Sequence, residues 1–168
     1  MPTAEATLSY PAVLESFQEE LRLLSDLYRA IRRQRRYMLH RQVDAMREQI
    51  AHIDSLMPRV RTATRRREVL LLTAGLMPQP TGSALKEWVE SADDPWRGRL
   101  DGALTALAKV GSRLRQINFQ NFQLARFSLD LTQEEIHILA GEAETGVGYS
   151  VEGDPTKAPG RGVVNGRA

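Results

Sequence analysis

The sequence predicts an all-α protein: an antiparallel, coiled-coil-like helical bundle followed by a disordered C-terminal tail. The 46 residues from 12 to 57 contain neither glycine nor proline and are rich in Leu, Arg, Glu and Gln, a composition that favours long helices. Apolar residues recur at alternating steps of three and four in three segments, which is the spacing of a coiled-coil seam. A single rod of 46 residues would extend about 70 Å with its apolar stripe in water. We therefore expect these helices to pack against one another.

Composition limits both the domain count and the classes of function. The chain has 168 residues, of which 42% are hydrophobic, and its net charge is +2. These values predict one domain with a modest core, and they argue against a molecule that binds polyanions over its whole surface. The absence of cysteine excludes disulfides, thiol nucleophiles and cysteine-based zinc sites. We see neither a membrane-spanning run nor a secretory signal, so we expect a cytoplasmic protein without membrane insertion.

Two seams predict the first two helices. The first consists of Tyr10, Leu14, Phe17, Leu21, Leu24, Tyr28, Ile31, Arg35 and Met38. The second consists of Val43, Met46, Ile50, Ile53, Met57, Val60, Thr64, Arg67 and Leu71. The phase slips by one residue between positions 39 and 43, which indicates either a stutter in one helix or the turn of a hairpin. Charge favours a hairpin that turns near residue 41, because this fold places the arginines at 65–67 beside Glu15 and Glu19. Pro58 is then expected to kink the second helix or to mark a boundary.

The rest of the chain predicts a linker, a short helix, a third long helix and a tail. After the linker MPQPTGS, Ser83 is expected to cap a short helix over residues 84–91, and Asp94 followed by Pro95 is a strong helix start. The third seam consists of Trp96, Leu100, Ala103, Leu107, Val110, Leu114, Ile117, Asn121, Leu124, Ser128, Leu131, Glu135 and Ile138. Gly141 is expected to end this helix. We therefore predict a flexible N-terminus over residues 1–9, a helical domain over 10–140 and a flexible Gly/Pro-rich tail over 141–168.

Enzymatic and metal-binding motifs are poorly represented. The sequence has no glycine-rich phosphate loop, no HExxH and no GxSxG. Glu134 and His137 have the spacing of one half of a carboxylate di-iron site, but the second Glu-x-x-His that such a site requires is missing. We predict a protein that is not an enzyme, with no catalytic residues, no metal site and no cofactor.

Two clusters of arginine are candidates for a nucleic-acid-binding face. One covers residues 29–36 and the other residues 59–67. Through Gly75 the chain has 13 arginines against nine acidic residues, and much of that surplus can pair across the hairpin. No aromatic side chains are interleaved for base stacking. A solvated helix face is the favoured interpretation, an acidic partner or a nucleic acid is the alternative, and no nucleic-acid partner is expected.

An amide pair marks the late part of the third helix. Asn118 and Asn121 lie one turn apart, and Asn121 falls on the seam itself. An asparagine in an apolar interface fixes register or oligomeric state when its amide is hydrogen-bonded. The alternative is that the pair binds a partner segment laid along the helix. Phe119, Phe122 and Phe127 point in several directions around this helix, which suggests a surface that receives a partner. Both interpretations remain open at this point.

In the order of its predicted helices and in several short motifs, the sequence resembles the FlgN-type flagellar type III export chaperones. The resemblance covers roughly residues 10–153. It rests on the helical hairpin, the arginines at 65–67 followed by Ala-Gly-Leu at 74–76, and the short linker helix. It rests further on Asn118-x-x-Asn121 with Leu124 behind it, and on a tyrosine–glycine element at 149–153.

This resemblance implies a chaperone for the hook-associated proteins of the hook–filament junction. Such a chaperone holds a helix-prone terminal segment of its client, prevents premature assembly and delivers the client to the flagellar export gate. The partner-binding residues implied are Ile117, Asn118, Asn121, Phe122, Leu124, Leu131 and, for the export gate, Tyr149. The chain is then a monomer or a dimer. The alternative is a generic coiled-coil adaptor or scaffold without an export role.

Overall fold

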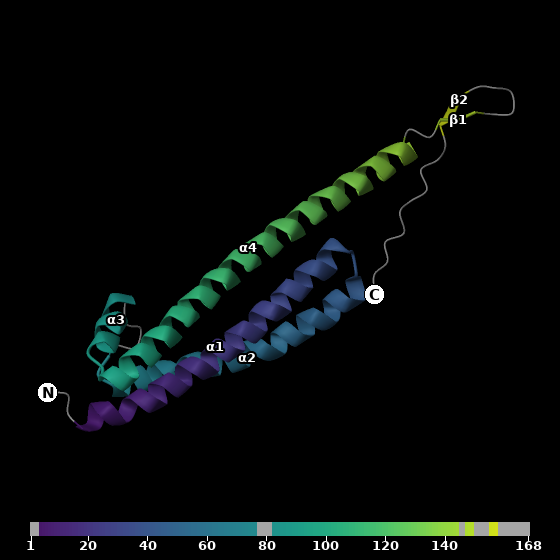
Figure 1. Cartoon of the computed structure of the whole chain (residues 1–168). Helices are drawn as coiled ribbons and strands as arrows, with labels where there is room; N and C mark the ends of the chain where they lie inside the picture. Colours follow the sequence, from purple (N-terminus) through teal and green to yellow (C-terminus); the bar gives the residue numbers. More distant parts are fainter. Residues whose placement is uncertain (1–3, 77–81, 145–146, 150–154, 158–168) are drawn as a thin grey trace. The chain divides into compact units, whose positions relative to one another are not determined.

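A hairpin of two long helices forms the base of the structure. The computed structural model describes residues 4–76, 82–144, 147–149 and 155–157, drawn in Figure 1. The elements are α1 (Ala4–Leu39), α2 (Val43–Thr73), α3 (Gly82–Glu90), α4 (Asp94–Glu144), β1 (Val147–Tyr149) and β2 (Pro155–Lys157). The chain divides into two compact units, Met1–Phe122 and Gln123–Ala168. The predicted all-α architecture of a hairpin, a short helix and a third long helix is confirmed.

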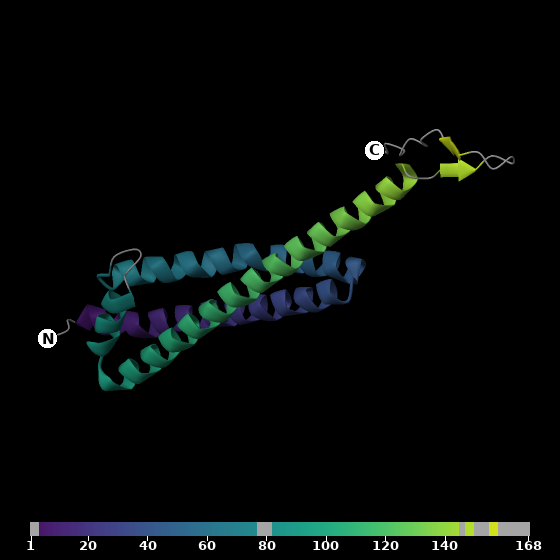
Figure 2. The same cartoon turned by 90° about the horizontal axis from the view of Figure 1, so that it is seen from above.

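The turn of the hairpin lies at the phase slip between the first two seams. The amide of Arg41 donates to the carbonyl of Met38 at 3.2 Å, and the amide of Gln42 donates to that of Tyr37 at 3.0 Å. These two bonds form a Schellman motif, which needs a left-handed residue, and Arg41 has a φ of 53°. The same motif ends α2, where Gly75 takes a φ of 83°. The turn reverses the chain so that α1 and α2 run antiparallel, side by side (Figures 1 and 2).

Ion pairs between the two helices set the hairpin register. The Glu20 side chain is only 6% exposed, and its Oε2 lies 3.1 Å from Nε of Arg67. The hydroxyl of Thr64 donates to Oε1 of the same carboxylate at 2.8 Å. On the surface, Arg66 pairs with Glu19 at 3.0 Å. Charge compensation across the hairpin is therefore confirmed at Glu19, whereas the second partner is Glu20 and not Glu15 as predicted.

The first core cluster joins all four helices of the first unit. Phe17 from α1, Leu71 from α2, Val89 from α3 and Leu100 from α4 are almost completely buried in it. The ring of Tyr10 packs against that of Trp88, with centroids 5.2 Å apart and the planes tilted by 57°. The short helix α3 therefore closes the end of the bundle where α1 begins and α2 ends.

A second cluster shows that α1 is the central helix. Leu27 and Ile31 of α1 pack against Val60 and Ala63 of α2, and Ile117 of α4 joins them. Since α1 is covered from two sides, its buried face is wider than one seam. The seam predicted for α2 is only partly correct, because two of its members are exposed: Val43 (51%) and Ile50 (39%). Three residues outside that seam, Gln49, Leu56 and Ala63, are buried instead.

Several predicted boundaries need correction. Helix α1 begins at Ala4, six residues before Tyr10, because Ala, Glu and Leu favour helix there. Helix α2 runs through Pro58 without a boundary. Helix α3 begins at Gly82, and α4 continues through Gly141 to Glu144, since one glycine costs a helix only about 1 kcal/mol and good helix formers follow it.

The C-terminal segment contains one feature that the sequence analysis did not predict. Strand β1 pairs antiparallel with β2, with Val147 opposite Lys157, Gly148 opposite Thr156 and Tyr149 opposite Pro155. Val and Tyr favour strands, and the segment has no helical periodicity. Pairing of the two strands satisfies backbone hydrogen-bonding groups in it. The other residues of the predicted tail, 145–146, 150–154 and 158–168, lie outside the described residues, as do 1–3 and 77–81 of the N-terminus and linker.

Replacing Arg67 with Met is expected to lower the free energy of unfolding by about 3 kcal/mol, because the buried carboxylate of Glu20 then loses its charged partner. The double variant Glu20→Leu/Arg67→Met should recover most of that loss, since no charge remains buried. Arg66→Met, which removes an exposed pair, should cost less than about 1 kcal/mol. Urea unfolding of the three variants measures this. Equal losses in the Arg66 and Arg67 variants would contradict the role given to Glu20.

Candidate functional site

The seam of α4 is buried as far as Asn121. Leu100, Leu107, Val110 and Ile117 on this seam are each at most 9% exposed. Ile117 belongs to the second core cluster with residues of α1 and α2. Its side chain therefore supports the bundle from inside, and it does not line an open groove as the resemblance implied.

Asn121 makes an intramolecular contact. Its side chain is 6% exposed, and Nδ2 donates to the carbonyl of Ile31 at 3.2 Å and to Oε1 of Gln34 at 3.4 Å. Its Oδ1 is buried and has no hydrogen-bond partner within the described residues. The amide therefore ties α4 to α1 at one level, which is the register-fixing role of an asparagine on an apolar seam.

Asn118 lies one turn earlier and is exposed. It stands at the edge of a cleft of about 470 Å³ between α1, α2 and α4. The polar side chains of this cleft are Gln34, Asp54, Arg115 and Asn118, and the apolar ones are Leu27, Ile31, Ile50, Ile53, Met57 and Leu114. The structure thus separates the two asparagines that the sequence placed together: one is committed to the bundle and the other is accessible.

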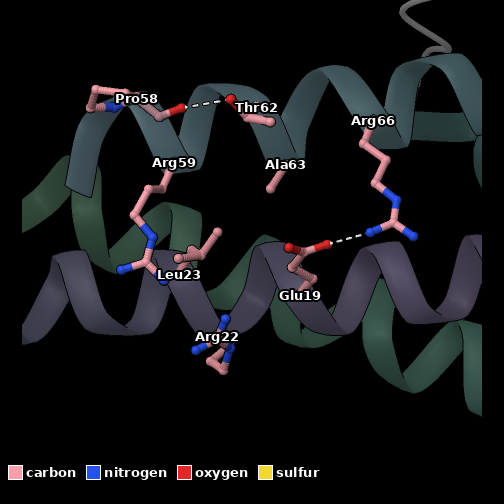
Figure 3. A pocket seen from close by; sticks show the side chains of 8 residues that line it. All are labelled: Glu19, Arg22, Leu23, Pro58, Arg59, Thr62, Ala63 and Arg66. Atoms are coloured by element: carbon pink, nitrogen blue, oxygen red, sulfur yellow. Dashed lines mark hydrogen bonds and ion pairs between the residues drawn. The ribbon is translucent and has the colours of Figure 1, made fainter. Parts of the chain in front are cut away.

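A second cleft, of about 330 Å³, lies between α1 and α2. Figure 3 shows Glu19 and Arg66 facing each other across it, joined by their ion pair, and the hydroxyl of Thr62 bonded to the carbonyl of Pro58. Arg22 and Arg59 supply further charge to its lining. Because the ion pair and the charged lining leave little apolar surface, this cleft suits an apolar client less well than the cleft beside Asn118.

The second unit exposes a large apolar surface on the remainder of α4. Leu124 and Leu131 are half-buried. Five further apolar residues are more than half exposed: Phe127, Leu129, Ile136, Ile138 and Leu139. In the first unit, Phe119 and Phe122 are likewise about 60% exposed. Several exposed large apolar side chains on one helix mark a site of interaction.

The exposed residues follow a pattern that the sequence analysis missed. Phe122, Leu129 and Ile136 are spaced by seven, as are Leu124, Leu131 and Ile138. Leu129 lies five residues after Leu124, which is a turn of about 140° around the helix. Two stripes therefore run along α4, and the small residues Ala125, Ser128 and Thr132 fall between them. Exposed apolar stripes on a helix need a partner that covers them. We call the six residues of these two stripes the α4 face.

One protein family matches most of the chain. The family model described as FlgN protein matches residues 1–157. The chain belongs to the FlgN family. No curated protein and no solved structure shows a significant match to it. FlgN proteins are flagellar type III export chaperones that bind flagellar substrate proteins, and the family is not known for enzymatic activity.

Tyr149 of this FlgN chain ends strand β1, where its backbone pairs with Pro155. The predicted site residue thus lies in a short two-stranded element of the second unit. The neighbouring residues 150–154 of the tyrosine–glycine element lie outside the described residues.

Within the described parts of the chain, no group of three or more metal-ligating side chains occurs, and Glu134 and His137 are both exposed. Among the same residues, no helix is long and apolar enough to cross a bilayer.

Replacing Asn121 with Ala is expected to destabilise the fold by about 1 kcal/mol, because the bond to the Ile31 carbonyl is lost inside the bundle. Asn118→Ala should change stability by less than about 0.5 kcal/mol, since this side chain is exposed. Thermal unfolding of both variants gives the comparison. Identical stability of the two variants would contradict the structural role of Asn121.

Proposed function

We propose that this FlgN chain is a cytoplasmic chaperone for the hook-associated proteins of the hook–filament junction. It binds their terminal helical segments, prevents premature assembly and delivers them to the flagellar type III export apparatus. The observation that carries the proposal is the α4 face, an apolar surface on a long helix of a chaperone-family protein.

The chemistry of the α4 face suits a helical client. An amphipathic helix places apolar side chains at i, i+3, i+4 and i+7, and it buries them against a matching apolar surface. The stripe of Leu124 and Leu131 and the stripe of Phe122 and Leu129 offer such a surface on two flanks of α4. The small residues between the stripes allow the two backbones to approach closely.

The predicted site residues divide into two groups under this proposal. Phe122, Leu124 and Leu131 contact the client directly, and Asn118 contributes an amide at the edge of the neighbouring cleft. Ile117 and Asn121 anchor α4 in the bundle and act through its position. This division follows from burial, because the second group is less than 10% exposed.

The double variant Leu129→Ser/Ile136→Ser is expected to weaken client binding about 100-fold, because two apolar side chains that would be buried in the complex, together worth about 3 kcal/mol, are lost. Calorimetric titration with C-terminal peptides of hook-associated proteins measures the affinity, and a negative heat-capacity change should accompany binding. The unfolding temperature should stay nearly constant because both residues are exposed.

The matched control is Gln123→Ser/Asp130→Ser, which changes two exposed polar residues of the same helix that lie three or four residues from no member of the α4 face. It should bind the client as the wild type does. The proposal fails if no hook-associated peptide binds and light scattering shows a tight oligomer, because the α4 face is then a self-association surface of a scaffold.

Deleting residues 145–168 should abolish association with the export gate and leave client binding unchanged, because α4 remains complete to Glu144. Tyr149→Ala in the full chain should reproduce the loss if this residue contacts the gate. Pull-down with the purified cytoplasmic part of the export gate measures the association. Loss of client binding in the truncated chain would show instead that the tail takes part in holding the client.

A further inference from the structure

The C-terminal half of α1 carries a large excess of positive charge. Between Leu27 and Val43 the sequence contains six arginines and no aspartate or glutamate. Like charges spaced by three and four residues destabilise a helix. The fold therefore tolerates an unfavourable arrangement here, and the FlgN client-binding surface on α4 does not use it.

Four of these arginines form one surface. Arg29, Arg32, Arg33 and Arg36 are spaced i, i+3, i+4 and i+7, so they share one side of α1. All four are exposed, and together they line a cleft of about 330 Å³. The buried residues Leu27, Ala30 and Ile31 occupy the opposite side of the same turns. We call the four residues the arginine face.

The contacts of the arginine face leave most of its charge available. Arg29 pairs with Asp26 in the preceding turn. The guanidinium carbon of Arg32 lies 5.9 Å from the ring centroid of Tyr28, and that of Arg36 lies 5.5 Å from the ring of Tyr37. Cation–π contact positions a guanidinium while its edge N–H groups can still bind a carboxylate. Asp26 is the only carboxylate within the described residues that pairs with any of the four.

The other arginine cluster shows how the fold behaves when it neutralises charge. Arg66 and Arg67 pair with Glu19 and Glu20 across the hairpin. No ion pair crosses to the arginine face from α2 or α4 within the described residues. The contrast indicates that the charge of the arginine face serves a contact outside the folded chain.

We propose that the arginine face is a docking site for an acidic amphipathic helix of a partner protein, separate from the client. Its four guanidinium groups extend over seven helical steps, about 10 Å along α1. Asp or Glu residues at i, i+3, i+4 and i+7 of a second helix have the same spacing along the helix axis as these four arginines. Arginine forms bidentate bonds with carboxylates, so each matched pair adds geometric selection as well as attraction.

A protein partner fits these observations better than a nucleic acid does. A nucleic-acid site spreads positive charge over an extended surface, whereas the charged cleft covers two turns of one helix and the whole chain has a net charge of only +2. Base stacking needs open aromatic rings. The nearby Tyr28 and Tyr37 are half-buried and covered by their own arginines.

The test is fluorescence anisotropy with the full chain and a labelled helical peptide that carries Glu at i, i+3, i+4 and i+7. The matched peptide has Gln at these positions. The variant Arg32→Gln/Arg33→Gln/Arg36→Gln should bind the Glu peptide at least about tenfold more weakly than the wild type does. Binding to the wild type should fall as salt rises, because exposed charges are screened.

The control variant Arg61→Gln/Arg65→Gln/Arg113→Gln removes the same charge from exposed positions elsewhere and should bind the Glu peptide as the wild type does. Circular dichroism verifies that both variants are folded. The proposal is overturned if the wild type binds neither peptide, if it binds both equally, or if the control loses as much affinity as the variant. Tighter binding of a DNA duplex that displaces the peptide would also overturn it, in favour of a nucleic-acid face.

This proposal and the proposed chaperone function fail separately. Titration with the hook-associated peptide should give the same affinity for the wild type and for the arginine-face variant, because the α4 face is untouched. Loss of client binding in this variant would overturn the assignment of a second, separate site. Absence of client binding in the wild type would contradict the chaperone function. It would not affect the acidic-peptide result, which tests the arginine face alone.

Discussion

A buried carboxylate fixes the register on which the rest of the bundle depends. Glu20 is 6% exposed, and its oxygens are contacted by Arg67 and Thr64 of the opposing helix. A charge removed from water requires its partners, so α1 and α2 cannot slide past each other without leaving it unpaired. With this register fixed, Val60 and Ala63 pack on α1 beside Ile117 of α4. Helix α4 therefore packs on a surface whose alignment depends on one polar contact.

Helix α4 shows that one seam can have two roles. Its spacing of three and four continues from Trp96 to Ile138, yet Leu100 is fully buried and Ile138 is 53% exposed. The local sequence is equally suited to packing in both halves. The two halves differ in whether other helices cover the seam. Asn121 lies at the end of the covered part, and its amide donates to the carbonyl of Ile31 in the last buried turn of α1.

The sequence was sufficient to predict the hairpin and the buried seam of α4, because the seam spacing and the phase slip are local signals. It could not separate Asn118 from Asn121 in role, since only packing shows that one is buried and the other open. The α4 face was also incompletely predicted. Leu129 and Ile136 lie off the seam, and their spacing of seven from Phe122 was the signal that could have found them. The pairing of β1 with β2 depends on contacts between segments that are too short to show any period.

The two proposed surfaces differ in the physics of what they can hold. A client helix bound to the α4 face buries apolar area but must become ordered as it binds, and the loss of entropy reduces the net affinity. A partner at the arginine face is attracted over a distance comparable to the Debye length, which accelerates encounter, but exposed pairs add little affinity at physiological salt. A carrier must hold its client during transit and exchange its other contacts quickly. Under the two proposals, apolar contact on one helix and charge on another would let the lifetimes of the two complexes be set independently.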